Sequence, residues 1–138
     1  MIETHFVLYV ENQQLSTQFY QAVLELEPFL NVPGMTEFQL SSGSILGLMP
    51  ESGIKKLLGS VLPDPSIGKG APRAELYLVV ENASEYYERA MRAGATSLSE
   101  IADRDWGHRV AYCLDLDANV LALACLLYTS DAADEEDV

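Results

Sequence analysis

The chain of 138 residues contains an internal repeat, and this repeat limits the possible folds more than any other feature. Residues 6–12 read FVLYVEN and residues 76–82 read LYLVVEN, so an apolar strand ending in Glu and Asn occurs twice. Each copy precedes a segment with apolar residues at helical spacing and then short strand-like runs divided by turn residues. The order strand, helix, about three strands therefore occurs twice and predicts two modules of one design.

The first module covers residues 1–50. Its predicted helix ends at Pro28 and carries one apolar stripe, formed by Leu15, Phe19, Ala22, Val23 and Leu26. Predicted strands at 35–40 and 44–49 flank residues 41–43, read as a hairpin turn in which Gly43 supplies a positive φ. Residues 51–73, rich in proline and glycine around a short helix at 54–58, form the predicted linker.

The second module covers residues 74–124. Asn82 and Glu85 form a predicted capping pair for its helix, whose stripe is formed by Ala83, Tyr86, Tyr87 and Ala90. Gly94 is the predicted end of that helix, and strands follow at 97–101, 109–114 and 119–124. Both helices are apolar on one side only, so we expect each to lie on a sheet.

Charge limits the partners. The chain has 21 acidic and 8 basic residues, a formal net charge of -13, which disfavours nucleic acid and anionic membranes. The amino terminus lacks the basic start of a secretory signal, and the longest apolar run, 120–127, is shorter than the roughly 20 residues that span a bilayer. We therefore expect a cytoplasmic protein in which Cys113 and Cys125 are reduced.

Residues 125–138 hold five acidic residues and no basic one, and we expect a disordered acidic tail. It is either a solvated end or a partner-binding segment. A third interpretation is favoured: residues 125–137 resemble the translation of sequencing-adapter read-through, which implies that the native chain ends near Ala124. We assign the tail no function.

Residues 1–124 resemble the vicinal oxygen chelate (VOC) superfamily, which includes glyoxalase I, fosfomycin and bleomycin resistance proteins and extradiol dioxygenases. The likeness is carried by residues 5–12, by Ser16, Phe19 and Tyr20, and by residues 115–120. It implies an α+β fold in which two βαβββ modules pair curved mixed sheets into a cup. It also implies a small organic ligand and, commonly, a homodimer.

Metal-dependent members of this superfamily bind Ni, Zn, Fe or Mn through one His or Glu on each of four strands. The resemblance matches His5 to the first ligand and Glu75 to the third. At the other two positions the chain has Gly47 and Ala122, and neither can bind a metal or act as a base. We therefore expect an incomplete metal site and no cofactor, with a divalent metal as the alternative.

Residues 104–112 resemble the loop and strand that line the open side of the cup, and they contain the single Trp. Trp106 suits stacking on a planar or cationic ligand, and Arg109 suits an anionic group. His108 and Tyr112 complete the predicted ligand-binding set. The alternative is that Trp106 closes the core. Tyr9, Tyr77 and Tyr112 lie on predicted strands and are candidate hydroxyl donors to the cup, with core packing as the default expectation for each.

Three functions remain open. The first is a metal-independent protein that binds a small molecule, as bleomycin resistance proteins do. The second is a metal-dependent lyase or isomerase of the glyoxalase type that uses His5 and Glu75, and the third is a structural or regulatory dimer without a ligand. The sequence does not decide whether the protein is an enzyme.

Overall fold

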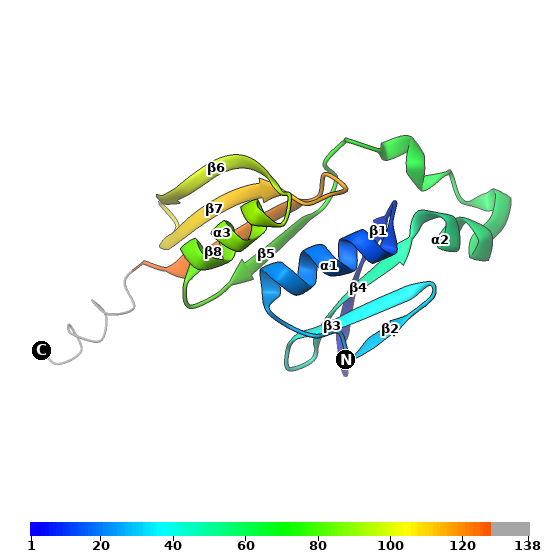
Figure 1. The fold of residues 1–138 in the computed structure, drawn as a ribbon, viewed down its shortest axis with the longest axis horizontal. Coiled ribbons are helices and arrows are strands. Elements are labelled where there is room, and N and C mark those ends of the chain that lie inside the picture. The colour runs from blue at the N-terminus through cyan, green and yellow to red at the C-terminus, as the bar shows by residue number, and fades with distance from the viewer. Residues whose placement is uncertain (128–138) are drawn as a thin grey trace, which may run out of the picture. The chain divides into compact units, whose positions relative to one another are not determined.

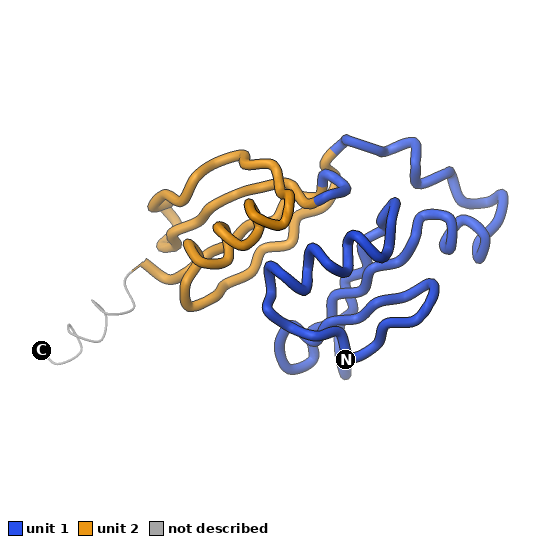
Figure 2. The backbone as a smooth tube through the Cα atoms, in the orientation of Figure 1, with its two compact units in different colours: residues 1–71, 116–118 blue, residues 72–115, 119–138 orange. Residues whose placement is uncertain are grey.

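The computed structural model describes residues 1–127, and these divide into two compact units (Figure 2). Unit 1 comprises residues 1–71 with 116–118, and unit 2 begins at residue 72 and contains the rest. Each unit holds a four-stranded mixed sheet and a helix that follows its first strand. The α+β class and the two βαβββ modules predicted from the repeat are confirmed.

Unit 1 is built on the sheet order β1-β4-β3-β2 (Figure 1). Its elements are β1 (Thr4–Val10), α1 (Gln13–Leu24), β2 (Leu30–Val32), β3 (Met35–Ser41), β4 (Ser44–Pro50) and α2 (Glu51–Leu58). Strands β1 and β4 are parallel and the other pairs antiparallel. Two 3-10 turns, Gly59–Val61 and Pro65–Gly68, follow α2 in the segment predicted as a linker.

Helix α1 begins where the Asn12 side chain accepts a hydrogen bond from the Leu15 backbone N–H, at 3.0 Å. It ends at Leu24, before Pro28, because Glu25 has a left-handed backbone with φ 53°. The predicted stripe is right for Phe19 and Val23, which are buried. It is wrong for three of its members, which are exposed: Leu15, Ala22 and Leu26. The buried stripe is rotated and includes Ser16, Thr17 and Tyr20, because Thr17 contacts the buried Thr36 hydroxyl of β3.

Unit 2 repeats this plan in the order β5-β8-β7-β6. Its elements are β5 (Glu75–Val79), α3 (Ala83–Arg92), β6 (Thr96–Asp103), β7 (His108–Leu114) and β8 (Val120–Leu126). The Asn82 side chain accepts from the Glu85 N–H at 3.2 Å, so both copies of the Glu-Asn motif start a helix in the same way. Strand β8 continues to Leu126, so residues 125 and 126 belong to the sheet rather than to the predicted tail. The prediction for residues 128–138 lies outside the described residues.

The turn between β7 and β8 contributes residues 116–118 to unit 1. There Asp117 accepts a hydrogen bond from the Glu11 backbone N–H at 2.8 Å and another from the Ser16 hydroxyl at 3.1 Å. These contacts join the end of β1 and the first turn of α1 to a segment about a hundred residues later in the chain. Unit 1 therefore includes a turn that comes from the second half of the chain.

Within residues 1–127, every helix is too short and too polar to cross a membrane. The longest, α1, has 12 residues, whereas a spanning helix needs about 20.

Candidate functional site

Each sheet has one face covered by a helix and one open face. In unit 1, α1 packs on β3 and β4, and Thr36 lies on the covered face because the α1 side chains of Gln13 and Thr17 bond to it. Side chains alternate along a strand, so Met35 and Glu37 lie on the other face of β3. His5 contacts Glu37 and therefore shares this face, which we call the first open face.

His5 lies between two carboxylates. Its Nε2 is 2.6 Å from Glu3 Oε2, and its Nδ1 is 3.3 Å from Glu37 Oε2. The hydrogen bond to Glu3 raises the pKa of His5, and the negative charges of Glu3 and Glu37 act in the same direction. An imidazolium donates from both ring nitrogens, so this arrangement suits the protonated ring.

The same geometry does not suit a metal ion. A metal binds one imidazole nitrogen, and here the two carboxylates lie at opposite nitrogens and do not converge on one point. At Gly47, a Cβ atom would lie 3.3 Å from Val7 Cγ2 and 3.4 Å from Met35 Sδ, so a larger ligand side chain would displace them. Among residues 1–127, no three His, Cys, Asp or Glu side chains are grouped to hold a metal.

The open face of unit 2 is aromatic. Strand alternation places Val110, Ala122 and Ala124 on the face away from α3, where Tyr77 and Tyr112 pack against them. Ala122 lies between the two tyrosines in the register and is 0% exposed. The rings therefore occupy the space in which a fourth metal ligand would stand. Glu75, at the start of β5, is on the same face and is exposed.

We call the open face of unit 2 the second open face. On it, the side chains of Trp106, Tyr77 and His108 form a hydrogen-bonded chain. Trp106 Nε1 donates to Tyr77 Oη at 2.9 Å, and Tyr77 Oη lies 2.6 Å from His108 Nδ1. Indole can only donate, so the Tyr77 hydroxyl accepts from Trp106, and this leaves its own hydrogen available to donate. In the tautomer in which His108 Nδ1 accepts from Tyr77, the ring hydrogen lies on Nε2 and can be donated to a ligand.

Tyr112 and Arg104 stand beside this chain. The Arg104 guanidinium carbon lies 5.2 Å from the centre of the Tyr112 ring, and Nη2 donates to Ser99 Oγ and to the Val110 carbonyl, each at 2.9 Å. Burial raises the pKa of the Tyr112 phenol, and the negative charge of Glu75 raises it further. Tyr112 is therefore a neutral hydrogen-bond donor at neutral pH.

Arg109 does not join the other three predicted ligand-binding residues. It alternates with His108 along β7, so it lies on the opposite face, where its Nε donates to Asp103 at 2.7 Å. Arg104 places a positive charge next to Tyr112 on the second open face. The sequence prediction missed Arg104 and treated Tyr77 as core. A signal for the two faces was present in the sequence. Tyr77 alternates with the buried Leu76 along β5, and His108 alternates with Arg109 along β7, so neighbouring residues face opposite sides of the sheet.

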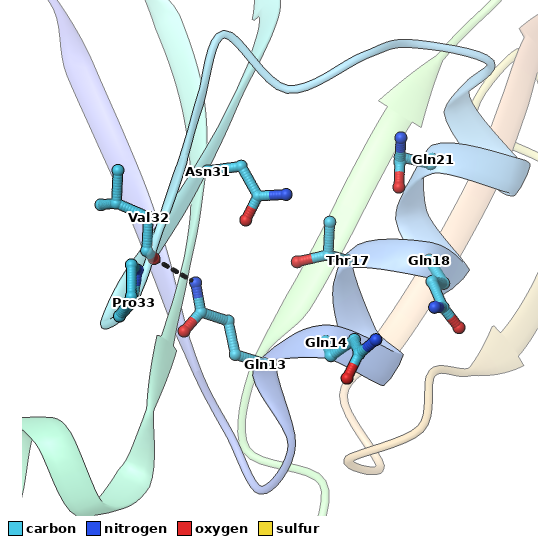
Figure 3. A pocket seen from close by; sticks show the side chains of 8 residues that line it. All are labelled: Gln13, Gln14, Thr17, Gln18, Gln21, Asn31, Val32 and Pro33. Atoms are coloured by element: carbon cyan, nitrogen blue, oxygen red, sulfur yellow. Dashed lines mark hydrogen bonds between the residues drawn. The ribbon is translucent and has the colours of Figure 1, made fainter.

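Two open pockets in unit 1 lie away from the predicted site residues. One, of about 380 Å³, separates α1 from β2 and the turn after it (Figure 3). The other, of about 460 Å³, lies between the start of α2 and the 3-10 turns.

The chain is similar to known proteins along nearly all of its described length. The model of the glyoxalase-like domain matches residues 4–126. A glyoxalase-related enzyme from Fulvimarina pelagi superposes with a TM-score of 0.74 at 18% identity, covering 88% of this chain and 86% of that one. A glyoxalase/bleomycin resistance protein/dioxygenase from Nocardioides gives 0.72 at 20% identity, covering 94% and 85%. A protein from Agrobacterium tumefaciens gives 0.69 at 28% identity, covering 91% and 98%. No curated protein matches the chain.

Proposed function

The chain belongs to the glyoxalase-like domain family, and from this premise we propose that it binds a small organic molecule on the second open face without a metal. The observation that carries the proposal is the hydrogen-bonded chain Trp106–Tyr77–His108. It places the polar groups of Tyr77 and His108 next to the ring of Trp106, a residue that is 53% exposed although its N–H is hydrogen-bonded. Such a surface suits a planar ligand that carries hydrogen-bonding groups.

The neighbouring residues support the same ligand chemistry. Tyr112 adds a donor, His108 adds its second ring nitrogen, Arg104 adds a positive charge, and Glu75 adds a negative one at the edge. Donors of this kind recognise the oxygen atoms of phenols, diols and carbonyl compounds. Metal chemistry has no support at two of the four strand positions, where Gly47 is crowded by Val7 and Met35 and Ala122 is covered by tyrosine rings.

The single Trp makes the test local. The full chain is titrated with a panel of cationic antibiotics, thiol adducts and aromatic diols while Trp106 fluorescence is followed. We expect at least one class to change the fluorescence and to raise the melting temperature, since binding to the folded state alone stabilises it. Tyr77→Phe should weaken binding about fivefold by removing one hydrogen-bonding group. Tyr86→Phe, on α3, is the matched control. A flat response to the whole panel favours a dimer without a ligand and overturns the proposal.

A metal-dependent lyase or isomerase of the glyoxalase type is the second candidate. It would need Glu37, which reaches His5 from β3, to turn from the Nδ1 atom that it now contacts and to supply the carboxylate that Gly47 lacks. We expect less than about 0.1 equivalent of divalent metal in the purified protein. Near-stoichiometric Ni, Zn, Fe or Mn that His5→Ala removes would establish this candidate instead.

We also propose that the protein is a homodimer, as is common among VOC proteins. Strand β1 is an edge of its sheet and exposes Phe6 and Tyr9, at 54% and 42%. Exposed apolar side chains on an edge strand favour association. Light scattering coupled to gel filtration should give twice the mass of one chain, and Phe6→Glu should shift the protein towards the monomer. A wild-type mass of 15.2 kDa would contradict this proposal.

A further inference from the structure

The pocket between α1 and β2 is lined by carboxamides to an unusual degree. Four of the five glutamines in the sequence line it, Gln13, Gln14, Gln18 and Gln21, together with Asn31 and Thr17. Its lining contains no acidic or basic residue, although the chain as a whole has a net charge of -13. An ordinary solvated helix face in such a chain would carry charged residues, so the neutral lining needs another explanation.

Gln13 holds the two walls of the pocket together. Its Nε2 donates to the Val32 carbonyl at 2.8 Å and to Thr36 Oγ1 at 2.9 Å, and its Oε1 accepts from the Gly34 N–H at 2.9 Å. Figure 3 shows this side chain reaching from the start of α1 to the strand and turn that form the opposite wall. The pocket is therefore formed before any ligand arrives, which lowers the entropy lost on binding.

Three of the other amides, those of Gln14, Gln18 and Asn31, have groups left for a ligand, whereas Gln21 Nε2 already donates to Glu27 Oε2 at 2.9 Å. Gln14 and Gln18 are exposed, and neither side chain makes a hydrogen bond within residues 1–127. Asn31 accepts from Thr36 through Oδ1 at 3.2 Å, which leaves its NH₂ group to donate. Each carboxamide offers two donors and an acceptor, a set that matches neighbouring hydroxyl groups or amides and provides no charge for an ion.

We propose that this pocket binds a neutral molecule with neighbouring hydroxyl or amide groups, such as a sugar or a peptide backbone segment. A volume of about 380 Å³ falls in the range of small-molecule sites. This site is on the α1 side of unit 1 and is independent of the function proposed for unit 2.

Three neutral probes and one charged probe test the inference: glucose, N-acetylglucosamine, N-acetylalaninamide and glucuronate. Each is titrated to about 50 mM into the ¹⁵N-labelled full chain, and amide chemical shifts are followed, because an open polar pocket binds fragments weakly. We expect shift changes at the backbone N–H groups of Gln18, Val32 and Gly34 with at least one neutral probe. Glucose responding without the amide indicates a sugar ligand, and the reverse indicates a peptide.

Gln14→Ala/Gln18→Ala should weaken the response about fivefold and leave the fold intact, because alanine favours an exposed helix position. Gln39→Ala, the fifth glutamine, lies on β3 away from the pocket and is the matched control. The inference is overturned if none of the neutral probes shifts these amides, if glucuronate binds as tightly as glucose, or if the double variant responds like Gln39→Ala.

Discussion

Asp117→Ala should destabilise the protein out of proportion to the exposure of the turn in which it lies. The carboxylate accepts from the Glu11 N–H at 2.8 Å and from the Ser16 hydroxyl at 3.1 Å, and Ser16 is 3% exposed. A hydrogen bond to a charged group contributes about 1.5–3 kcal/mol, and the bond near solvent belongs at the low end. The variant also leaves the buried Ser16 hydroxyl without this acceptor.

One effect acts in the opposite direction. The charge of Asp117 repels Glu51 and, with burial as the larger cause, raises the pKa of that carboxyl, so its removal relieves some repulsion. We therefore expect a net loss of about 2 kcal/mol in the free energy of unfolding, equivalent to about 6–10 °C in melting temperature. Asp117→Asn keeps one acceptor oxygen and should lose about half as much.

Urea unfolding monitored by circular dichroism gives the free energy, and thermal melts give the second measure. Asp105→Ala, which removes an equal charge from the β6–β7 turn, is the control for net charge. If Asp117→Ala is as stable as Asp105→Ala to within about 0.5 kcal/mol, the contacts of Asp117 do not stabilise unit 1 and the reasoning fails.

Four further predictions concern unit 2. Deleting residues 125–138 should lower the melting temperature more than deleting residues 128–138, because Cys125 and Leu126 pair with Arg109 and His108 of β7. Equal melting temperatures of the two truncated proteins would show that Cys125 and Leu126 do not contribute to the fold. Burial raises the pKa of Cys113 to about 11, so a thiol reagent should modify Cys125 first in the native protein and Cys113 only on unfolding. Folding raises this pKa, so the buried neutral thiol contributes its full stabilisation below about pH 8.5, and the stabilisation is lost as the pH rises towards 11. Cys113→Ala should therefore show a smaller loss of melting temperature over this pH range. Arg104→Ala should weaken binding of a ligand found by Trp106 fluorescence, whereas Arg109→Ala should leave its affinity within about twofold because Arg109 faces Asp103 on the other side of the sheet.

The repeat predicts the modules well because it acts through local chemistry. Asn12 and Asn82 cap helices by the same side-chain bond, and the apolar runs before them become the first strands. The three-residue strand β2 was not predicted, because Leu30–Val32 is too short to show alternation. The end of α1 was placed too late because the left-handed backbone of Glu25 leaves no mark that distinguishes it from other glutamates.

The site is harder to predict because its residues depend on which side of a strand they occupy. A single strand pattern does not tell whether Arg109 or its neighbour His108 faces the ligand, and the bulges between β6 and β7 shift the register nearby. Arg104 enters the second open face from the loop before β7, and no sequence period reports that position. The sequence shows the glutamines of α1, but the pocket exists only because β2 and the turn after it form the opposite wall, and the sequence does not show that β2 lies there.

The Asp117 contacts also affect the order in which the modules can form during synthesis. Residues 1–71 leave the ribosome first, yet the bond from Asp117 to Glu11 spans 106 residues and closes only when most of the second module has been made. Until then, the end of β1 and the first turn of α1 lack one of their partners. The amino-terminal half of the chain is therefore made first, but its native structure is complete only when the second half has joined it.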